Sequence, residues 1–286
     1  RGRWLWRPAS QYRTSDDDDA DDGDDDGSCL QGSVPKHVYY APASWHACQD
    51  GLLLDEKARQ RAANSALVDT DTARLVPVVR IPKFFSIEDI ALIHEAARVI
   101  KPLASMERHG ETARVPGPWD TTYLHTNGLF IEHYSAMYTR LLQTVAEVDA
   151  STPGWGVLQA AMEKNKLPIR VRTMEYHEVT PGGTIADVEH YDGGSLITMD
   201  VMLADPDKDF EGGKFQTLED EDTGRLEQHK FQQGDAMVFL SHKNHCVSQV
   251  TAGRRNVLVF EVWQGEERTC PHRCCKRWGP CTMCLK

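Results

Sequence analysis

Residues 234–263 read GDAMVFLSHKNHCVSQVTAGRRNVLVFEVW, and this stretch decides the fold class. It holds three short runs rich in β-branched and aromatic residues: Ala236 to Leu240, Cys246 to Val250 and Asn256 to Trp263. Glycine-containing turns come before the first run and before the last one. Short runs of this composition between such turns are typical of antiparallel strands. The stretch therefore predicts a β-rich C-terminal half.

The same pattern extends upstream as far as Pro168. Four more runs of this kind precede the quoted stretch: Ile169 to Tyr176, Leu196 to Leu203, Lys214 to Leu218 and Arg225 to Phe231. Turn signals such as Pro181-Gly182-Gly183 separate them. Because many short strands at this spacing fold into two packed layers or a closed sheet, residues 169–263 predict an antiparallel jelly roll (double-stranded β-helix) or barrel.

In front of the strands, apolar residues recur at helical spacing. Ser86 comes directly before such a run, and Asp89 stands three residues after Ser86. Ser86 is therefore a predicted helix N-cap, and Pro102 is the predicted end of this helix. A second run places eight residues on one stripe: Phe130, Tyr134, Met137, Tyr138, Leu141, Leu142, Val145 and Val148. A shorter run covers about residues 155–165. Helices within residues 86–165 followed by a jelly roll define an α+β fold class.

Composition excludes several classes of function. The chain has 286 residues, a net charge of −11 and 40% hydrophobic residues, which is typical of a globular protein and argues against nucleic-acid binding. Nine Asp fall between Asp16 and Asp26, so residues 1–35 are a predicted disordered acidic tail. The longest apolar stretch, Ser195 to Ala204, is interrupted by Asp200 and is too short to span a bilayer. We therefore expect no membrane span in this sequence.

A candidate metal centre follows from His190 and Asp192, which stand one residue apart before a Gly-Gly turn. His245 comes 55 residues later, and Arg255 follows it by ten. Two imidazoles and one carboxylate on one face of a metal leave positions open, as in non-haem Fe(II) oxygenases, although a zinc hydrolase also uses three protein ligands. Arg255 favours the oxygenase, because a guanidinium inside a β-barrel needs an anion and its fork suits the carboxylate of a diacid cosubstrate.

At these residues the sequence resembles the Fe(II)/2-oxoglutarate dioxygenase superfamily, specifically the prolyl 4-hydroxylase-type catalytic domain. The residues that match the family pattern are His190, Asp192, His245, Val247, Val250, Gly253 and Arg255. Phe210-Glu211-Gly212-Gly213 also resembles the family's segment between the two metal-binding strands. One departure concerns the basic position, where collagen-type members usually carry Lys and this chain has Arg255.

The resemblance implies a catalytic domain over residues 76–265. It implies that His190, Asp192 and His245 hold Fe(II), that Arg255 binds the far carboxylate of 2-oxoglutarate, that O2 is the second cosubstrate and that ascorbate serves as reductant. Tyr176 and Thr198 are further candidates for contacts to the cosubstrate.

The implied reaction is hydroxylation of an aliphatic C–H, with release of succinate and CO2. A peptidyl, prolyl-type substrate is expected. The alternatives are an oxygenase that acts on a small molecule and a non-catalytic jelly-roll interaction module that binds metal. The sequence does not indicate an oligomeric state.

The C-terminal segment, residues 266–286, is rich in cysteine. Its cysteines are Cys270, Cys274, Cys275, Cys281 and Cys284, and His272 lies among them. Disulfide bonds are the favoured interpretation, with a small zinc site as the alternative and free thiols as a third reading. Disulfides would place the protein in the secretory pathway, in the endoplasmic reticulum lumen, and reduced cysteines would suit the cytoplasm.

Overall fold

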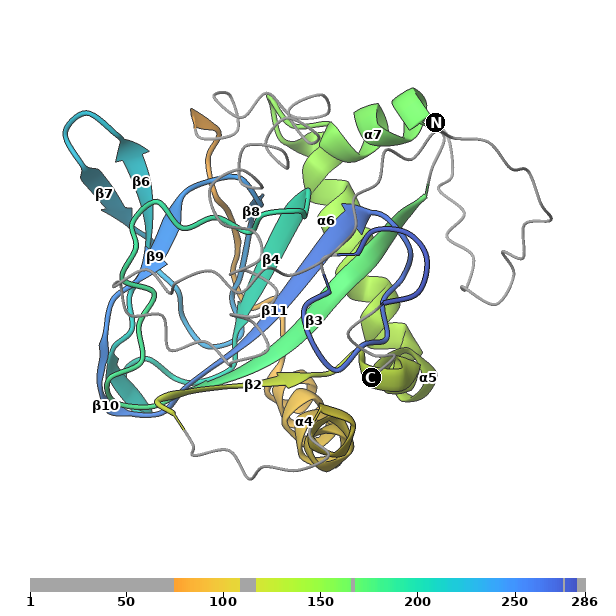
Figure 1. The fold of residues 1–286 in the computed structure, drawn as a ribbon. Coiled ribbons are helices and arrows are strands. Elements are labelled where there is room, and N and C mark those ends of the chain that lie inside the picture. Colours follow the sequence, from red (N-terminus) through yellow and green to blue (C-terminus); the bar gives the residue numbers. More distant parts are fainter. Residues whose placement is uncertain (1–74, 109–116, 166–167, 275, 282–286) are drawn as a thin grey trace, which may run out of the picture.

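The computed structural model describes residues 75–108, 117–165, 168–274 and 276–281. The predicted acidic tail, together with Cys275 and Cys284, lies outside these residues. Within them, helices and antiparallel sheets combine into an α+β arrangement (Figure 1). The mixture of helices and antiparallel strands predicted from the sequence is therefore observed.

A six-stranded antiparallel sheet forms the centre of the described structure. Its strands, in spatial order, are β1 (Val79–Ile81), β8 (Ala236–Leu240), β4 (Ile197–Met202), β11 (Arg255–Gln264), β3 (Ile169–Val179) and β2 (Trp119–Tyr123). The long strand β11 pairs with β4 on one side and with β3 on the other. The last strand of the predicted β-rich half therefore pairs directly with the first, β3.

Two smaller antiparallel sheets lie against one face of the large sheet. One has the order β7 (Arg225–Gln228), β6 (Phe215–Asp220) and β9 (His245–Val247), and the other pairs β10 (Val250–Gly253) with β5 (Phe210–Gly212). Phe215 of β6 packs against Phe239 of β8, with 5.5 Å between the ring centroids. The layer between the sheets is thus an apolar core built from both.

Helices cover the opposite face of the large sheet. They are α4 (Ile87–Arg108), the 3₁₀ turn η2 (Thr126–Gly128), α5 (Leu129–His133), α6 (Ser135–Ser151) and α7 (Val157–Asn165). Figure 1 shows α6 behind β3 and β11. Ile93 of α4 and Leu141 of α6 are fully buried in one cluster with Val238 and Phe260 of the sheet. This second core holds the helices on the sheet.

The helix predictions are right at the start of α4 and wrong at its end. Ser86 Oγ accepts a hydrogen bond from the Asp89 backbone N–H at 3.1 Å, and Asp89 Oδ2 accepts one from the Ser86 N–H at 3.0 Å, which is a reciprocal capping box. Pro102, however, lies inside the helix. Its fixed φ suits a helix, and the helix loses one N–H donor there. The predicted second helix divides into α5 and α6 at Tyr134, whose backbone is not helical.

The strand predictions also need corrections. The structure adds three short strands that the sequence patterns did not indicate, namely β1, β2 and β5, and it divides the run from Cys246 to Val250 between β9 and β10. β1 and β5 have three residues each. Such strands are too short to show an alternating pattern, because two-residue periodicity needs at least four residues to be recognised.

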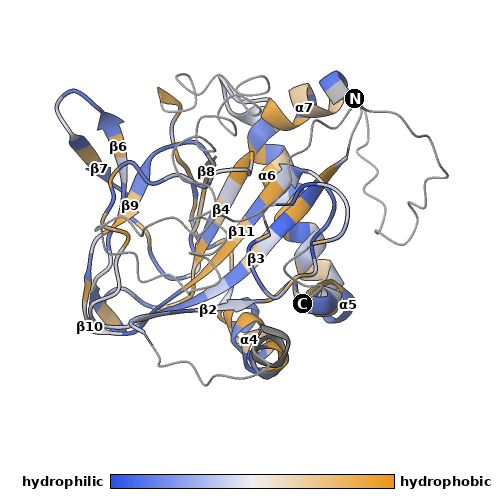
Figure 2. Ribbon diagram, viewed as in Figure 1, coloured by the Kyte–Doolittle hydropathy of each residue, from blue (hydrophilic) through white to orange (hydrophobic). Residues whose placement is uncertain are grey.

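Alternation along the strands of the large sheet decides which side chains reach the space between the sheets. In β4, Ile197, Met199 and Val201 face the helices, whereas Thr198 and Asp200 face the other way. Figure 2 shows hydrophilic and hydrophobic residues in turn along β3. One face of the sheet is therefore partly polar, and this is the face that carries the candidate site.

A β-bulge changes the alternation within β3. Glu261 of β11 pairs with Thr173 and Val262 pairs with Val171, so Arg172 is an extra residue in β3. After the bulge, Tyr176 faces the helices, and Glu175 and His177 face the smaller sheets. The bulge thus determines which residues of β3 can contribute to the site.

In the part of the chain that the structure describes, no helix is both long and apolar enough to cross a bilayer.

Candidate active site

The structure brings His190, Asp192 and His245 together. His190 and Asp192 lie in the loop between β3 and β4, and His245 is the first residue of β9. One ligand-type atom from each lies within 4.8 Å of the others, and all three residues are buried. His190 Nε2 is 3.6 Å from Asp192 Oδ1, and His245 Nε2 is 3.8 Å from Asp192 Oδ2. Although His245 is 55 residues from His190 in the sequence, the three side chains form one cluster with the composition of a facial metal site.

Backbone hydrogen bonds fix this cluster in place. The His245 N–H donates to the His190 carbonyl at 2.8 Å, and the Asp192 N–H donates to the Ser241 carbonyl at 2.7 Å. His245 Nδ1 lies 3.0 Å from the Lys243 carbonyl oxygen, which can only accept, so Nδ1 carries the hydrogen and Nε2 keeps its lone pair. Burial lowers the pKa of His245 to about 4, which keeps the imidazole neutral, as a metal ligand must be.

The carboxylate of Asp192 is oriented by two further side chains. Arg273 Nη2 donates to Oδ1 at 2.9 Å, and Thr198 Oγ1 donates to Oδ2 at 2.8 Å. Burial alone would raise the pKa of Asp192, but the Arg273 guanidinium holds this pKa well below its usual range. Asp192 is therefore charged, with both of its oxygens directed by hydrogen bonds.

Arg255 supplies a buried cation close to the cluster. It is the first residue of β11 and is 2% exposed, and its Nε and Nη2 have no hydrogen-bond partner among the described residues. Burial lowers the pKa of Arg255 to about 10, although the nearby Asp200 carboxyl opposes this shift. Burial also raises the pKa of Asp200 well above its usual range, so Asp200 is a poor counter-ion. Among the described residues, Arg255 is therefore a cation that lacks a strong anionic partner.

Gly213 leaves room for this guanidinium. A Cβ at position 213 would lie 2.8 Å from the Arg255 Cδ, and the glycine has a φ of +58°. The segment Phe210 to Gly213, which the sequence analysis singled out for its resemblance to the oxygenase family, therefore packs against the basic residue of the site. Position 213 requires glycine because a side chain there would collide with Arg255 and would have to adopt a left-handed backbone conformation.

The cluster and Arg255 line one cavity, whose empty space, open solvent included, is about 670 Å³. Its walls also include Trp119 of β2, His177 of β3 and Val257 of β11. Trp119 and His177 meet edge to face, with 5.3 Å between their centroids. The cavity is thus bounded by the metal-type cluster, a cation and an aromatic wall.

Tyr176 and Thr198, the two further candidates for contacts to the cosubstrate, do not line the cavity. Tyr176 packs in the core between the sheet and the helices, where its Oη lies 2.8 Å from His94 Nδ1 and accepts a hydrogen bond from Asn256 Nδ2 at 3.1 Å. It does not line the cavity, because the bulge at Arg172 turns it to the other face. Thr198 is close to the cluster, but it contacts Asp192 rather than the cavity.

Sequence reasoning missed four residues of the site with acidic or basic side chains. Glu175, Asp200, Glu261 and Arg273 all line the cavity. Arg273 Nη2 lies 2.6 Å from Glu261 Oε1, and burial raises the pKa of Glu261 to about 7 despite the neighbouring guanidinium. A signal existed for the glutamates, because Glu175 and Glu261 are charged residues within strongly β-type runs. Arg273 offered none, since it lies outside the predicted β-rich half.

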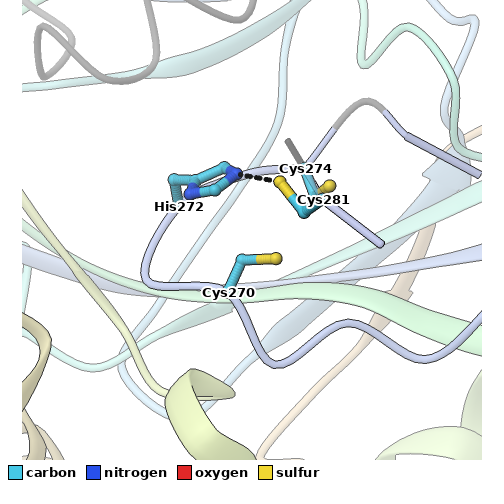
Figure 3. Close-up of side chains that lie close together, drawn as sticks. All are labelled: Cys270, His272, Cys274 and Cys281. Atoms are coloured by element: carbon cyan, nitrogen blue, oxygen red, sulfur yellow. Dashed lines mark hydrogen bonds between the residues drawn. The ribbon is translucent and has the colours of Figure 1, made fainter. Parts of the chain in front are cut away.

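The Cys-rich segment forms a second cluster. Cys270, His272, Cys274 and Cys281 each offer one ligand atom, and these atoms lie within 4.8 Å of one another (Figure 3). All four cysteines that the structure describes, Cys246 among them, have free thiols. The favoured disulfide interpretation is therefore not found in the described residues, and the expectation of a secretory location loses the support that it took from disulfides. The donors instead converge as the zinc alternative requires.

No protein-family model matches the sequence, and no curated protein matches it at a significant level. Solved structures similar to this chain include a 2OG-Fe(II) oxygenase and several prolyl hydroxylases. One is the viral collagen prolyl hydroxylase from Paramecium Bursaria Chlorella virus-1 in its 2OG complex. It is 14% identical, covers 66% of this chain and 96% of that chain, and has a TM-score of 0.44.

A second is a prolyl hydroxylase from Trichoplax adhaerens in complex with a hypoxia inducible factor oxygen degradation domain peptide fragment, at 12% identity over 73% of this chain and 92% of that chain, with a TM-score of 0.45. A third is HygX from Streptomyces hygroscopicus with nickel, 2-oxoglutarate and hygromycin B bound. It is 13% identical, covers 68% of this chain and 88% of that chain, and has a TM-score of 0.41.

Proposed function

We propose that this protein is an Fe(II)- and 2-oxoglutarate-dependent dioxygenase that hydroxylates an aliphatic C–H and releases succinate and CO2. One observation carries the proposal. Arg255, a buried guanidinium two of whose nitrogens have no hydrogen-bond partner among the described residues, lines the same cavity as a buried cluster of two histidines and one aspartate. A zinc hydrolase accounts for the cluster, but it gives the guanidinium no role. A diacid that binds a metal at one end accounts for both.

The fold supports this proposal. We propose that the large sheet and the two smaller sheets form the two layers of a jelly roll, or double-stranded β-helix, within a catalytic domain of residues 76–265. The candidate site lies between these layers, where inward-facing residues of opposite sheets meet. Residues 266–286 then form a C-terminal extension, of which the described part packs next to the site.

The residues present fit an iron ion. His190, Asp192 and His245 are buried and lie within 4.8 Å of one another, His245 is neutral, and Asp192 is ionised. When bound, Fe(II) would supply the oxygen activation that couples decarboxylation of 2-oxoglutarate to hydroxylation, with O2 as cosubstrate and ascorbate as reductant.

The side chains of this chain would bind the cosubstrate, orient a metal ligand and keep water out of the cavity. Arg255 would hold the far carboxylate of 2-oxoglutarate through a two-pronged hydrogen bond, which places the keto acid end toward the cluster. Thr198 and Arg273 keep the Asp192 carboxylate from rotating, because each directs one of its oxygens. The apolar residues Val257 and Val259 line the cavity and limit access of water to it.

We further propose a peptidyl substrate of the prolyl type. The resemblance of the motif to prolyl 4-hydroxylase-type domains supports it. Trp119 at the cavity also supports it, because an indole gives an apolar, rigid face to a saturated ring. Incubation of the iron-loaded enzyme with proline-rich peptides, followed by mass measurement for a gain of one oxygen atom, tests this finer part. A gain on a free small molecule and on no peptide would contradict it.

Anaerobic titration tests the enzyme class. Addition of Fe(II) and 2-oxoglutarate to the metal-free protein is expected to produce the visible charge-transfer absorption of a chelated keto acid. We expect the absorption to be absent in His245→Ala and to be retained in Arg254→Ala, which removes an exposed arginine next to Arg255. Absence of the absorption from the folded wild type at saturating iron and cosubstrate would refute the proposal.

A further inference from the structure

Four side chains with metal-binding atoms converge in the C-terminal segment, away from the histidines of the candidate active site. They are Cys270, His272, Cys274 and Cys281, with a spacing of one, one and six intervening residues. His272 Nε2 lies 3.3 Å from Cys281 Sγ (Figure 3). Cys270, His272 and Cys274 are buried, and Cys281 is partly exposed. No role in the proposed reaction calls for these thiols.

The donor set is that of a structural zinc site. Three thiolates and one imidazole are a standard tetrahedral combination for zinc, with all four positions filled by protein. With Zn–S bonds of about 2.3 Å, sulfur atoms at the corners of such a tetrahedron lie about 3.8 Å apart. The four donors within 4.8 Å are close to this arrangement, whereas a disulfide needs sulfurs about 2.05 Å apart.

The segment that carries these donors has little regular structure to stabilise it. Among its described residues, 266–274 and 276–281, there is no helix and no strand. Yet Cys270, His272, Arg273 and Cys274 are all buried. Ordering an irregular segment costs backbone entropy at every residue, and metal coordination is a known source of folding free energy for such segments. A metal held by these four donors would supply free energy for the packing of this segment.

The same segment reaches into the candidate active site. Arg273 lies between two of the donors, is 4% exposed, and donates from Nη2 to Asp192 Oδ1 at 2.9 Å. Arg172, the bulge residue of β3, donates from Nε to the Cys274 carbonyl at 2.9 Å. The position of the Cys-rich segment therefore fixes one of the two groups that orient the carboxylate of Asp192.

We propose that Cys270, His272, Cys274 and Cys281 bind a zinc ion, and that this ion holds Arg273 in place on Asp192. Arg273 is then a positioning residue for the candidate iron ligand. The zinc site follows from the cluster by itself. The effect on iron rests on the proposed function as well.

Metal analysis of the full chain tests the zinc site. Protein produced with added zinc and purified under reducing conditions is expected to hold one zinc per chain that survives dialysis. Cys270→Ser and Cys281→Ser are expected to lose it. The matched control Cys246→Ser, which removes a buried free cysteine of β9 outside the cluster, and His245→Ala are expected to keep it. Absence of zinc from the wild type, or its retention in both cluster variants, would overturn the zinc site.

A measurement on the wild type covers the case in which the cluster variants fail to fold. Cobalt(II) supplied to the metal-free protein is expected to give the intense absorption of tetrahedral thiolate coordination. A thiol reagent is expected to modify the cluster cysteines slowly in the zinc-loaded protein and rapidly once a chelator removes the metal. Cobalt absorption without thiolate character, or equal rates of modification with and without chelator, would overturn the zinc site.

Iron affinity tests the link between the two clusters. Loss of an outer hydrogen-bond partner of a metal ligand lowers metal affinity by about 10–100-fold, so Arg273→Ala is expected to weaken Fe(II) binding by this factor while its zinc content stays unchanged. Arg273→Lys is expected to restore part of the affinity, and Lys276→Ala, in the same segment, to leave it unaltered. Unchanged iron affinity in Arg273→Ala would overturn the positioning role. Failure of the wild type to bind iron at all would overturn the proposed function and leave the zinc result standing.

Discussion

The two buried clusters of ligand-type side chains differ in how the fold supports them. His245 of the first begins a strand, and backbone hydrogen bonds tie it to His190 and tie Asp192 to Ser241. The second, from Cys270 to Cys281, lies on a segment whose described residues include no helix and no strand. The comparison teaches that a site whose segments are joined by backbone hydrogen bonds is shaped before its metal arrives, whereas we expect a site on an irregular segment to depend on its metal for shape.

The clusters also differ in what surrounds them. Around Asp192, charged and polar groups are arranged so that each carboxylate oxygen has a donor, and the cavity beyond leaves space for a ligand. The second cluster is filled by its own four donors. The first therefore fits a catalytic centre, which keeps positions open, and the second fits a structural one, which is closed.

The largest expected effect is on turnover and comes from a ligand of the first cluster. His245→Ala removes a metal ligand, so we expect succinate formation to fall by more than the about 100-fold that loss of an outer partner can cost. Zinc content should not change. Succinate release measured in the presence of Fe(II), ascorbate and a hydroxylatable peptide checks this. Turnover within a factor of ten of the wild type would show that His245 is no ligand.

Removal of zinc should destabilise the protein more than removal of iron does. Structural zinc binds to small domains with about 10–16 kcal/mol, and a loss of even about 3 kcal/mol shifts Tm by about 6–12 °C for a domain of this size. We therefore expect zinc removal to lower Tm by about this amount or more, and iron removal to lower it by much less. Thermal unfolding of the two selectively stripped forms measures the difference. Equal shifts would contradict the contrast between a preformed site and a metal-dependent one.

Cosubstrate affinity should respond next. Arg255→Ala removes charge-assisted hydrogen bonds worth about 1.5–3 kcal/mol, which corresponds to about 10–150-fold weaker binding of 2-oxoglutarate, with iron binding retained. Calorimetric titration of the manganese-loaded protein measures it, with Arg254→Ala as the matched control. An unaltered 2-oxoglutarate affinity in Arg255→Ala would remove the anchor assignment.

A smaller effect is expected at the hydroxyl that directs Asp192. Thr198→Val keeps the shape of the side chain but removes the donor to Oδ2, so we expect Fe(II) affinity to fall by about 10-fold. Thr198→Ser keeps the hydroxyl and should remain close to the wild type. If the valine and serine variants bind iron equally well, the hydrogen bond does not orient the ligand.

The smallest effect on the site is expected at Tyr176. Tyr176→Phe removes its hydrogen bonds with His94 and Asn256 on the helix-facing side, which should lower the free energy of unfolding by about 1–2 kcal/mol. Because the phenol does not line the cavity, 2-oxoglutarate affinity should change by less than about twofold. A tenfold loss of 2-oxoglutarate affinity would show that Tyr176 does contact the cosubstrate.

Much of this organisation could be predicted from residue patterns. The resemblance of the motif at His190, Asp192, His245 and Arg255 to the Fe(II)/2-oxoglutarate dioxygenase superfamily implies that these residues meet, and in the structure they line one cavity. The face of β3 could not be predicted, since the bulge at Arg172 depends on pairing with β11. Arg273 was missed for a related reason. An irregular segment has no periodicity, so the position of its side chains follows only from tertiary contacts.

A crystal structure of the protein with Mn(II) in place of iron and with 2-oxoglutarate tests the central claim most directly. We expect anomalous scattering from manganese between His190 Nε2, His245 Nε2 and the Asp192 carboxylate, and the far carboxylate of the diacid on the Arg255 guanidinium. Manganese bound elsewhere, or a diacid that leaves Arg255 without a partner, would contradict the account.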